Sequence, residues 1–311
     1  MISNEKFHYK SHSHLELNLI DYLSENMKTV SKKKIKNIID SGGVYINNKR
    51  IFMAKFKLKA NDIITVFWSN EQETLKKLMY SLKPEQIIFE NEDFLVVNKP
   101  SGIPSQASLD SVHNTIISAL KKSFKNYESL DFHLVHRLDK DTSGLMILAK
   151  SKAVKKDFDE LFKSQSIKKT YHSLCFFSPK ENNGTISFPL AKDASRKNAY
   201  IVSNRENSKK ALTHYKVLVY NRNLDASYVE CKPKTGRTHQ IRVHLSAVGA
   251  PLLGDKTYAQ NVLSHSLKFK VLRHMLHASE LDFSYKNKAY KLKAEYPVDF
   301  QISLEQIKSD S

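Results

Sequence analysis

One short stretch of the sequence combines several groups that could do chemistry: residues 133–150, HLVHRLDKDTSGLMILAK. Asp139 and Asp141 lie two residues apart, Arg137 precedes them, and the turn-forming residues Thr-Ser-Gly follow. A carboxylate among arginines and lysines keeps a low pKa and stays ionised, which suits a nucleophile or a charge-stabilising group. Local spacing alone favours a simpler interpretation, in which Asp139 only caps the turn.

Aspartate-based phosphatases also carry two aspartates two residues apart, but their pair directly follows a buried apolar strand. Here HLVHR precedes the pair, and Arg137 would lie where that strand should be. Thr142 also follows Asp141 directly, one position too early for the phosphatase pattern. The sequence therefore disfavours this class.

Histidine pairs raise the possibility of a metal site. His239 and His244 are five residues apart, which places them on different faces of a helix. His274 and His277 are three apart, but His277 begins an expected strand. The chain has only 8 glycines and neither a Gly-rich phosphate loop nor a Gly-x-Ser-x-Gly elbow. We therefore expect no metal and no small-molecule cofactor.

Length and charge suggest the kind of partner. A chain of 311 residues usually forms two domains. Its formal charge of +18 indicates a polyanionic partner, with nucleic acid as the leading candidate and a merely solvated lysine-rich surface as the alternative. The two cysteines, Cys175 and Cys231, suggest no disulfide framework. With no signal peptide or long apolar run, we expect a cytoplasmic protein without a membrane partner.

The N-terminal part reads as a small basic module. Apolar spacing predicts one helix over 15–28 and a second over KKKIKNIID, which Ser31 caps and Gly42-Gly43 ends. VYI and RIFMA form a hairpin about Asn47-Asn48, and DIITVFW adds a last strand. The lysines of the second helix lie off its apolar side, and three are candidates for RNA contacts: Lys32, Lys33 and Lys36.

The sequence after the N-terminal module predicts an α+β fold with a large, mainly antiparallel sheet, because expected strands dominate and expected helices interrupt them irregularly. The expected strands are QIIFE, FLVVNK, TYHSLCFF, LTHYKVLVY, ASYVECKP, LHASELDFSY and AYKLKAEY. The expected helices are TIISALKKSF, KAVKKDFDELFK with Ser151 as its cap, and RTHQIRVHLSAVG with Gly249 as its stop. Residues 191–210 look like an exposed basic loop.

The motif HRLDKDTSGLMILAK resembles the signature of the pseudouridine synthases that modify ribosomal and transfer RNA, in the branch whose motif begins His-Arg-Leu-Asp. Further matches follow the order of that family: NKPSG at 98–102, KTY at 169–171, KALTHY at 210–215, TGRTHQIRVHLSAVGAPLLGDKTY at 235–258 and LHASELDF at 276–283. Residues 14–68 resemble the small RNA-binding domain named after a ribosomal small-subunit protein. The resemblance implies the pseudouridine synthase fold preceded by a basic appendage.

The resemblance also assigns roles to residues. Asp139 corresponds to the catalytic aspartate, which attacks the target uridine at the base or at the sugar anomeric carbon. Tyr171 corresponds to the tyrosine that stacks on the flipped base, and Arg242 to the arginine that pairs with the catalytic carboxylate. Arg137 corresponds to the residue that enters the RNA helix when the uridine leaves. An isomerisation of this kind requires no cofactor.

Alternatives stand beside several of these roles. Tyr171 could be a core tyrosine, Arg242 a phosphate contact, and Arg237 the carboxylate partner instead. Asp141 is expected to cap the turn. Three further residues are candidate RNA contacts, although the first could be structural: Lys99, Arg237 and His239.

The domain boundaries follow from the same motifs. We expect an extension at 1–13, an RNA-binding domain at 14–70, a linker at 71–85, a catalytic domain at 86–305 and a tail at 306–311. The expected protein is a monomer that acts on large-subunit ribosomal RNA, with transfer RNA as the alternative substrate. A non-catalytic ribosome-assembly factor on the same fold is the competing hypothesis from another class.

Overall fold

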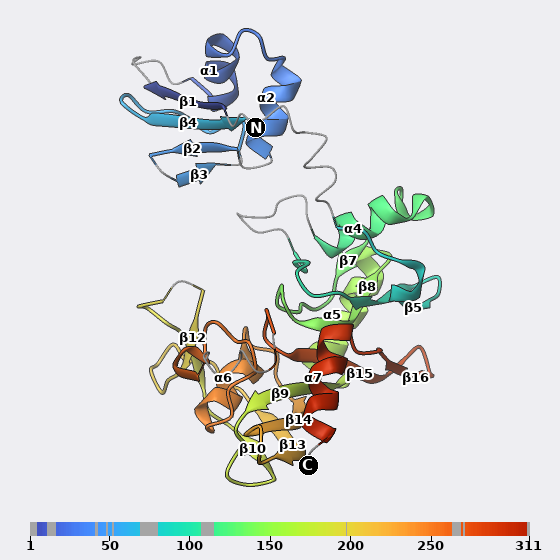
Figure 1. Ribbon diagram of the computed structural model, residues 1–311. Coiled ribbons are helices and arrows are strands. Elements are labelled where there is room, and N and C mark those ends of the chain that lie inside the picture. The colour runs from blue at the N-terminus through green and yellow to red at the C-terminus, as the bar shows by residue number, and fades with distance from the viewer. Residues whose placement is uncertain are drawn as a thin grey trace. The chain divides into compact units, whose positions relative to one another are not determined.

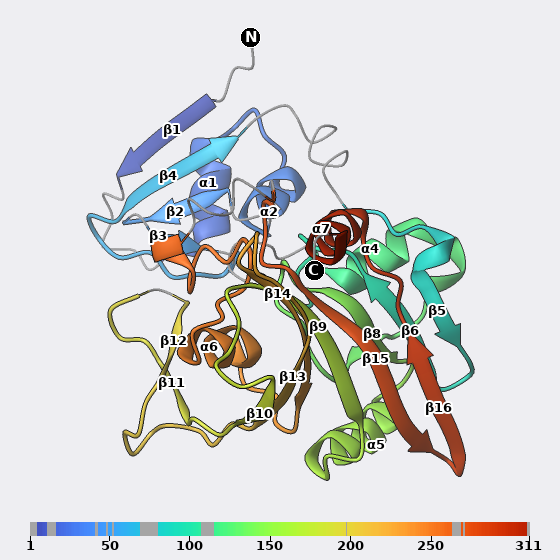
Figure 2. The ribbon, with the colours of Figure 1, turned by 60° about the horizontal axis from the view of Figure 1, so that its bottom comes forward.

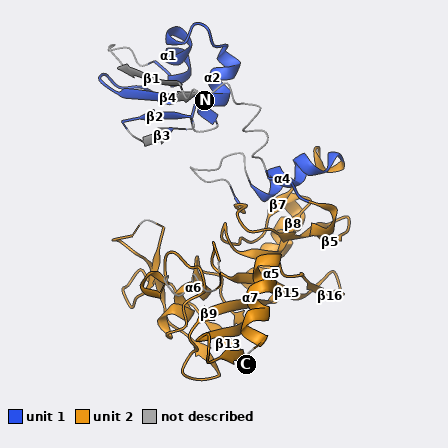
Figure 3. Ribbon diagram, viewed as in Figure 1, with its two compact units in different colours: residues 1–82, 106–125 blue, residues 83–105, 126–311 orange. Residues whose placement is uncertain are grey.

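The computed structural model of this chain divides it into two compact units (Figure 1, Figure 3). One unit comprises residues 1–82 and 106–125, and the other comprises residues 83–105 and 126–311. The structure describes residues 5–10, 17–40, 43–47, 49–51, 53–68, 80–106, 115–196, 198–262, 269 and 271–309. Most of the predicted linker at 71–85, and the turn residues Gly42 and Asn48, lie outside the described residues.

The first unit contains a four-stranded sheet in the order β1-β4-β2-β3, with antiparallel pairing throughout. Its strands are β1 (Glu5–Lys10), β4 (Ile63–Trp68), β2 (Val44–Ile46) and β3 (Lys49–Ile51). Its described helices are α1 (Leu19–Asn26), α2 (Lys32–Asp40) and α4 (Ile116–Ser123). The predicted helices and hairpin are confirmed. Strand β1 was not predicted, since residues 1–13 were expected to be an extension.

Helix α2 shows why its sequence folds as predicted. The Lys34 N–H donates to the Ser31 hydroxyl at 3.3 Å, which satisfies one unpaired N–H of the first turn. Ile35, Ile38 and Ile39 are buried against α1 and the sheet, while the lysines at 32, 33 and 36 are exposed. The helix therefore buries one apolar stripe and presents a basic face to solvent.

The second unit contains a ten-stranded sheet in the order β10-β13-β14-β9-β15-β8-β6-β5, with β16 beside β15 and β7 beside β8 (Figure 2). Every pairing is antiparallel except β15 with β8. The strands are β5 (Ile87–Glu90), β6 (Phe94–Lys99), β7 (His133–Leu134), β8 (Ser143–Ala149), β9 (Lys168–Phe176), β10 (Asn183–Ile186), β13 (Thr213–Asn221), β14 (Ala226–Pro233), β15 (Leu276–Tyr285) and β16 (Lys288–Lys293). This confirms the predicted α+β fold with a large, mainly antiparallel sheet.

Helices α5 (Lys152–Lys163), α6 (Gln240–Ala247) and α7 (Val298–Ser309) pack on this sheet. Successive residues of β9 point to opposite faces. Leu174 and Phe176 belong to the core that includes Phe300 of α7, whereas Cys175 belongs to the core that includes Ile241 of α6. Helices α6 and α7 therefore cover opposite faces of the sheet, and Tyr171 lies on the α6 side.

The structure corrects three further predictions. The expected basic loop at 191–210 contains a small antiparallel sheet of β11 (Leu190–Lys192) and β12 (Tyr200–Val202). Residues of the expected tail belong to α7, where Ile307 is fully buried. The helix predicted over RTHQIRVHLSAVG begins only at Gln240, because His239 adopts φ 57° and ends the preceding turn.

The structure also contains the single-turn 3₁₀ helices η1 (Pro84–Gln86) and η2 (Lys125–Tyr127). The hairpin between β15 and β16 turns at Lys286 and Asn287, both with positive φ. Among the described residues, none of the helices has the length and apolar character required to cross a membrane.

Candidate active site

Asp139 lies in the turn between β7 and β8, and the segment after β6 holds the backbone on both sides of it. The Lys99 ammonium donates to the Lys140 carbonyl at 3.0 Å, and the Gly102 N–H donates to the same oxygen at 2.9 Å. The Ser105 hydroxyl donates to the Leu138 carbonyl at 2.7 Å and accepts from the Leu138 N–H at 3.0 Å. The NKPSG motif and Ser105 thus fix the turn that carries Asp139.

The chain after Asp139 is held by the segment that leads into β15. The Thr142 N–H closes the turn onto the Asp139 carbonyl at 3.1 Å, and its hydroxyl lies 2.8 Å from the His274 Nε2 atom. Ser143 contacts His277 in the same way at 2.9 Å. At Gly144 the strands approach so closely that a Cβ atom would lie 2.3 Å from the Ala278 carbonyl oxygen. Only glycine fits there.

Arg242 of α6 reaches Asp139 across 103 residues of sequence, with its Nη1 atom 3.1 Å from the Asp139 Oδ2 atom. Two further bonds, at 2.7 and 2.9 Å, join the same guanidinium to both carboxylate oxygens of Asp255. The Tyr258 ring lies 5.0 Å from the guanidinium carbon. Asp255 is fully buried, so this bidentate pair fixes the plane of the guanidinium and aims its remaining nitrogen at Asp139.

The charges around Asp139 keep it ionised. Burial by itself raises the pKa of Asp139, but His239, Arg242 and His274 together outweigh burial and hold that pKa below its ordinary value of 3.8. The carboxylates of Asp255 and Asp139 raise the pKa of Arg242 despite its burial. At neutral pH the site therefore contains a carboxylate that is anionic and oriented.

His239 lies beside this pair. Its Nε2 atom is 3.8 Å from the Asp139 Oδ2 atom, and its Nδ1 atom is 2.8 Å from the Tyr258 hydroxyl. That hydroxyl already accepts from the Tyr200 N–H at 2.9 Å, so its own proton finds an acceptor in Nδ1. This arrangement favours the tautomer with the His239 proton on Nε2, facing Asp139. Burial lowers the pKa of His239, which favours this neutral form.

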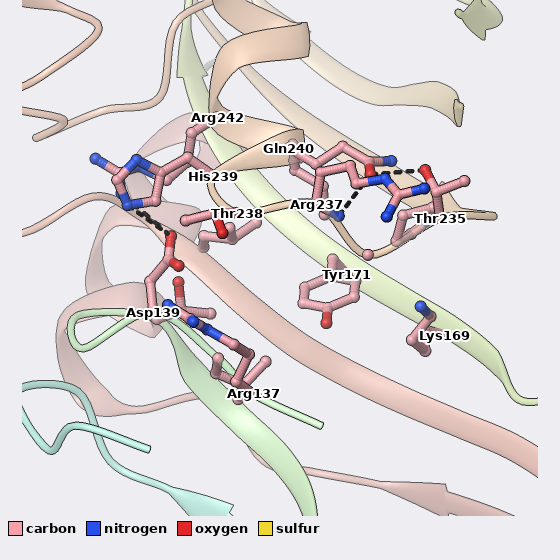
Figure 4. A pocket seen from close by; sticks show the side chains of 16 residues that line it. Arg137, Asp139, Lys169, Tyr171, Thr235, Arg237, Thr238, His239, Gln240 and Arg242 are labelled. Carbon is pink, nitrogen blue, oxygen red and sulfur yellow. Dashed lines mark hydrogen bonds and ion pairs between the residues drawn. The ribbon is translucent and has the colours of Figure 1, made fainter. Parts of the chain in front are cut away.

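Asp139, His239 and Arg242 line a pocket (Figure 4). Residues of β9 and of the turn before α6 line the same pocket. Asp139 and Arg242 lie on one side of it, and Tyr171 and Lys169 of β9 lie on the other with Arg237. Arg137 also lines the pocket and is exposed. Burial, followed by the nearby Asp139, raises the pKa of Tyr171, so its hydroxyl stays protonated at neutral pH. Tyr171 therefore lies across the pocket from an ionised carboxylate.

The structure gives different roles to Lys99 and Arg237, which the sequence suggested as RNA contacts. Lys99 is fully buried and donates to the carbonyls of Pro100, Ile103 and Lys140, so it is a structural residue and not an RNA contact. Arg237 donates to the Lys210 carbonyl at 3.1 Å, and Arg242 rather than Arg237 contacts Asp139.

The histidines considered as metal ligands bind other protein groups. His244 contacts Thr213 and the Phe188 carbonyl, and His277 contacts Ser143 and the Ala294 carbonyl. Within the described part of the chain, no group of three or more histidine, cysteine or acidic residues is arranged to hold a metal ion.

Sequence reasoning did not single out Asp255, His274 or Tyr258 as part of the site. Asp255 and Tyr258 lie in the GDKTY portion of the long motif at 235–258, so the signal was present. Only folding shows that this portion supports Arg242, because no local spacing links positions 242 and 255. His274 lies in the buried approach to β15, where burial lowers its pKa to about 4.

With this geometry in place, comparisons with known proteins define the class. The chain belongs to the RNA pseudouridylate synthase family, the family model of which matches residues 93–247. This family consists of isomerases that act on uridine in RNA. The resemblance inferred from the His-Arg-Leu-Asp motif is therefore confirmed.

Particular relatives are similar over almost the whole chain. Ribosomal large subunit pseudouridine synthase D of Zymomonas mobilis is 32% identical over 301 residues, which cover 90% of each chain. Ribosomal large subunit pseudouridine synthase C of Buchnera aphidicola is also 32% identical, again over 90% of each chain. The solved structure of human RNA pseudouridylate synthase domain containing 4 matches with a TM-score of 0.59 at 25% identity, covering 76% of this chain and 97% of that one.

Proposed function

We propose that this protein isomerises uridine to pseudouridine in large-subunit ribosomal RNA, with Asp139 as the catalytic residue. The single observation that carries the proposal is the buried Asp139–Arg242–Asp255 arrangement opposite Tyr171 in one pocket. The named relatives act on the ribosomal large subunit, which favours this RNA over transfer RNA. The proposed setting is the cytoplasm, and the proposed form is a monomer.

The geometry suits the chemistry of the isomerisation. The bond between uracil N1 and the sugar C1′ breaks, a bond between C5 and C1′ forms, C5 loses a proton and N1 gains one, so no oxidant or reductant is required. Asp139 supplies an anionic oxygen to attack or to stabilise the reacting centre. Tyr171 offers a face on which a flipped base would stack, a contact typically worth about 1–3 kcal/mol.

Arg242 and Arg137 have different proposed roles. Arg242 would hold the Asp139 carboxylate in one orientation, because Asp255 fixes its guanidinium from the other side. Arg137 is exposed at the pocket and would take the place of the flipped base in the RNA helix. His239 would keep its Nε2 proton directed at Asp139.

The first unit is proposed to add RNA affinity. Its helix α2 presents Lys32, Lys33 and Lys36 to solvent, although Lys32 and Lys36 are partly neutralised by Asp21 at 2.7 Å and Asp40 at 2.9 Å. Exposed ion pairs of this type are weak and exchange readily with a phosphate. We propose that this unit is the RNA-binding domain that the sequence resembles.

The test replaces Asp139 with Asn, which keeps the size of the side chain and removes its charge. Pseudouridine formed in an in vitro transcript of large-subunit ribosomal RNA should fall about 10³-fold or more, while RNA affinity stays close to that of the wild type. Asp159→Asn, in an exposed ion pair with Lys155 on α5, is the matched control. If the Asp139→Asn variant forms pseudouridine at the wild-type rate, Asp139 is not the catalytic residue. RNA binding by the wild type without any pseudouridine would favour an assembly factor.

A further inference from the structure

The pocket that contains Asp139 opens into a second hollow with an unusual balance of charge. This groove has a volume of about 500 Å³ and shares Arg137, Lys169, Tyr171 and the turn 235–237 with the pocket. Five lysines and arginines line the groove, and no aspartate or glutamate does: Arg137, Lys163, Lys169, Lys234 and Arg237. A concave surface of one charge sign concentrates a polyanion.

Lys169 is the groove residue that the rest of the fold leaves unexplained. It lies on β9, where the side chain is partly buried, and this burial lowers the pKa of Lys169. Its ammonium lies 5.8 Å from the Phe162 ring centre. Within the described residues, this ammonium makes no hydrogen bond or ion pair, in contrast to Lys99, which donates to three carbonyls.

A partly buried ammonium that has an aromatic ring beside it but no hydrogen bond or ion pair is costly, and folding alone gives no reason to keep it. Lys169 also lies against the turn before α6, since a Cβ atom on Gly236 would be only 3.9 Å from its nitrogen. The Arg237 guanidinium extends from the same turn and uses its Nε atom on the Lys210 carbonyl, which leaves its terminal nitrogens for a ligand. Figure 4 shows Lys169, Tyr171, Thr235 and Arg237 gathered on the same side of the pocket.

We propose that Lys169, with Arg237 beside it, forms a binding site for an RNA phosphodiester next to the flipped-out uridine. This inference rests on the proposed function, because it places the target base on Tyr171, two residues along β9 on the same face. The ammonium that is uncompensated in the free protein acquires its counter-ion only when RNA enters the groove. Lys169 is thus a binding residue for the strand and not a structural one.

The experiment measures RNA affinity against salt in the Asp139→Asn background, with an in vitro transcript of large-subunit ribosomal RNA as the probe. Lys169→Met should bind about tenfold more weakly. Its slope of log affinity against log salt should shrink by about 0.7 for a single-stranded contact or about 0.9 for a duplex contact. Lys169→Arg, which keeps the charge, should retain most of the affinity. Lys156→Met, on the exposed face of α5 and outside the groove, should change neither quantity.

Thermal melting of the RNA-free protein separates this site from a structural role. Lys169→Met should melt no lower than the parent protein, because it removes an unpaired charge from a desolvated position. A clearly lower melting temperature, an unchanged salt slope, or equal losses for Met and Arg would each overturn the phosphate site. The wild-type protein is assayed separately for pseudouridine. If it forms no pseudouridine, the proposed function is wrong. If it forms pseudouridine but Lys169→Met leaves RNA affinity and the salt slope unchanged, only this inference is wrong.

Discussion

At the scale of single residues, Asp139 is kept ionised by His239, by Arg242, which also donates a hydrogen bond to it, and by His274. The lowered pKa of Asp139 means that the anion persists as the pH falls to 3.8 and below. Activity that needs this anion therefore holds at mildly acidic pH and is lost only as the pH falls through the folded pKa. The same shift stabilises the fold above pH 3.8, and that stabilisation is lost over the same acidic interval.

This gives a prediction for the pair Arg242→Gln and Asp255→Asn, made together so that Asp255 is not left as a fully buried carboxylate without its arginine. Loss of the guanidinium should raise the pKa of Asp139, and the acidic limb of kcat/KM should move up by about 1–3 pH units. Pseudouridine formation measured across pH gives this limb directly. Arg237→Gln is the control, because Arg242 rather than Arg237 contacts Asp139. An acidic limb that stays in place would show that Arg242 does not keep Asp139 ionised.

At the scale of elements, the turn with Asp139 depends on how β8 and β15 meet. Gly144→Ala would force a Cβ atom to 2.3 Å from the Ala278 carbonyl oxygen at a residue with φ 114°. Gly249→Ala, after α6, has φ 82° and no atom within 4 Å of the added Cβ. Gly249→Ala should lower the free energy of unfolding by about 1–2 kcal/mol, from backbone strain alone.

Gly144→Ala adds a steric clash with the backbone of Ala278. It should lower the free energy of unfolding by about 4 kcal/mol or more. It should also reduce kcat, because the displaced strand begins four residues after Asp139. Urea unfolding of both variants beside wild type gives the two free energies. Equal costs would mean that the close approach of β8 and β15 does not constrain the turn.

Most elements of the sheet could be predicted from the sequence, because alternating apolar residues and turn residues are local signals. Strand β1 and helix α7 could not. The sequence EKFHYK in β1 has weak alternation and gains its pairing from β4, more than fifty residues away. In α7 the stabilising contacts come from the sheet core around Phe300, which local spacing does not reveal.

The candidate site could likewise be predicted only in part from the sequence. The identity of Asp139, Tyr171 and Arg242 was available from motifs, but the contact between Asp139 and Arg242 spans 103 residues. Lys99 was placed among the candidate RNA contacts, with a structural role as the alternative, and the fold supports the structural role. In the fold, three carbonyls of tight turns converge on its ammonium, and such convergence depends on tertiary structure alone.

At the scale of the whole molecule, we propose that the two units divide RNA affinity and chemistry between them. The pocket, the groove and Asp139 all belong to residues 83–105 and 126–311. The lysines of α2 belong to the other unit, so their contribution should be electrostatic and independent of the reacting base. This separation makes a prediction that distinguishes binding from catalysis.

Replacing Lys32, Lys33 and Lys36 together with Gln should weaken binding to the ribosomal RNA transcript and reduce the salt slope by up to about 2.7, at about 0.9 for each duplex phosphate contact. Because none of the three lysines lines the pocket, kcat at saturating RNA should stay within about twofold. The same three positions changed to Arg keep the charge and form the control. Affinity that is unchanged by Gln would exclude α2 from the RNA interface. A reduced kcat with unchanged affinity would instead couple the first unit to the chemical step, which electrostatic attraction alone cannot do.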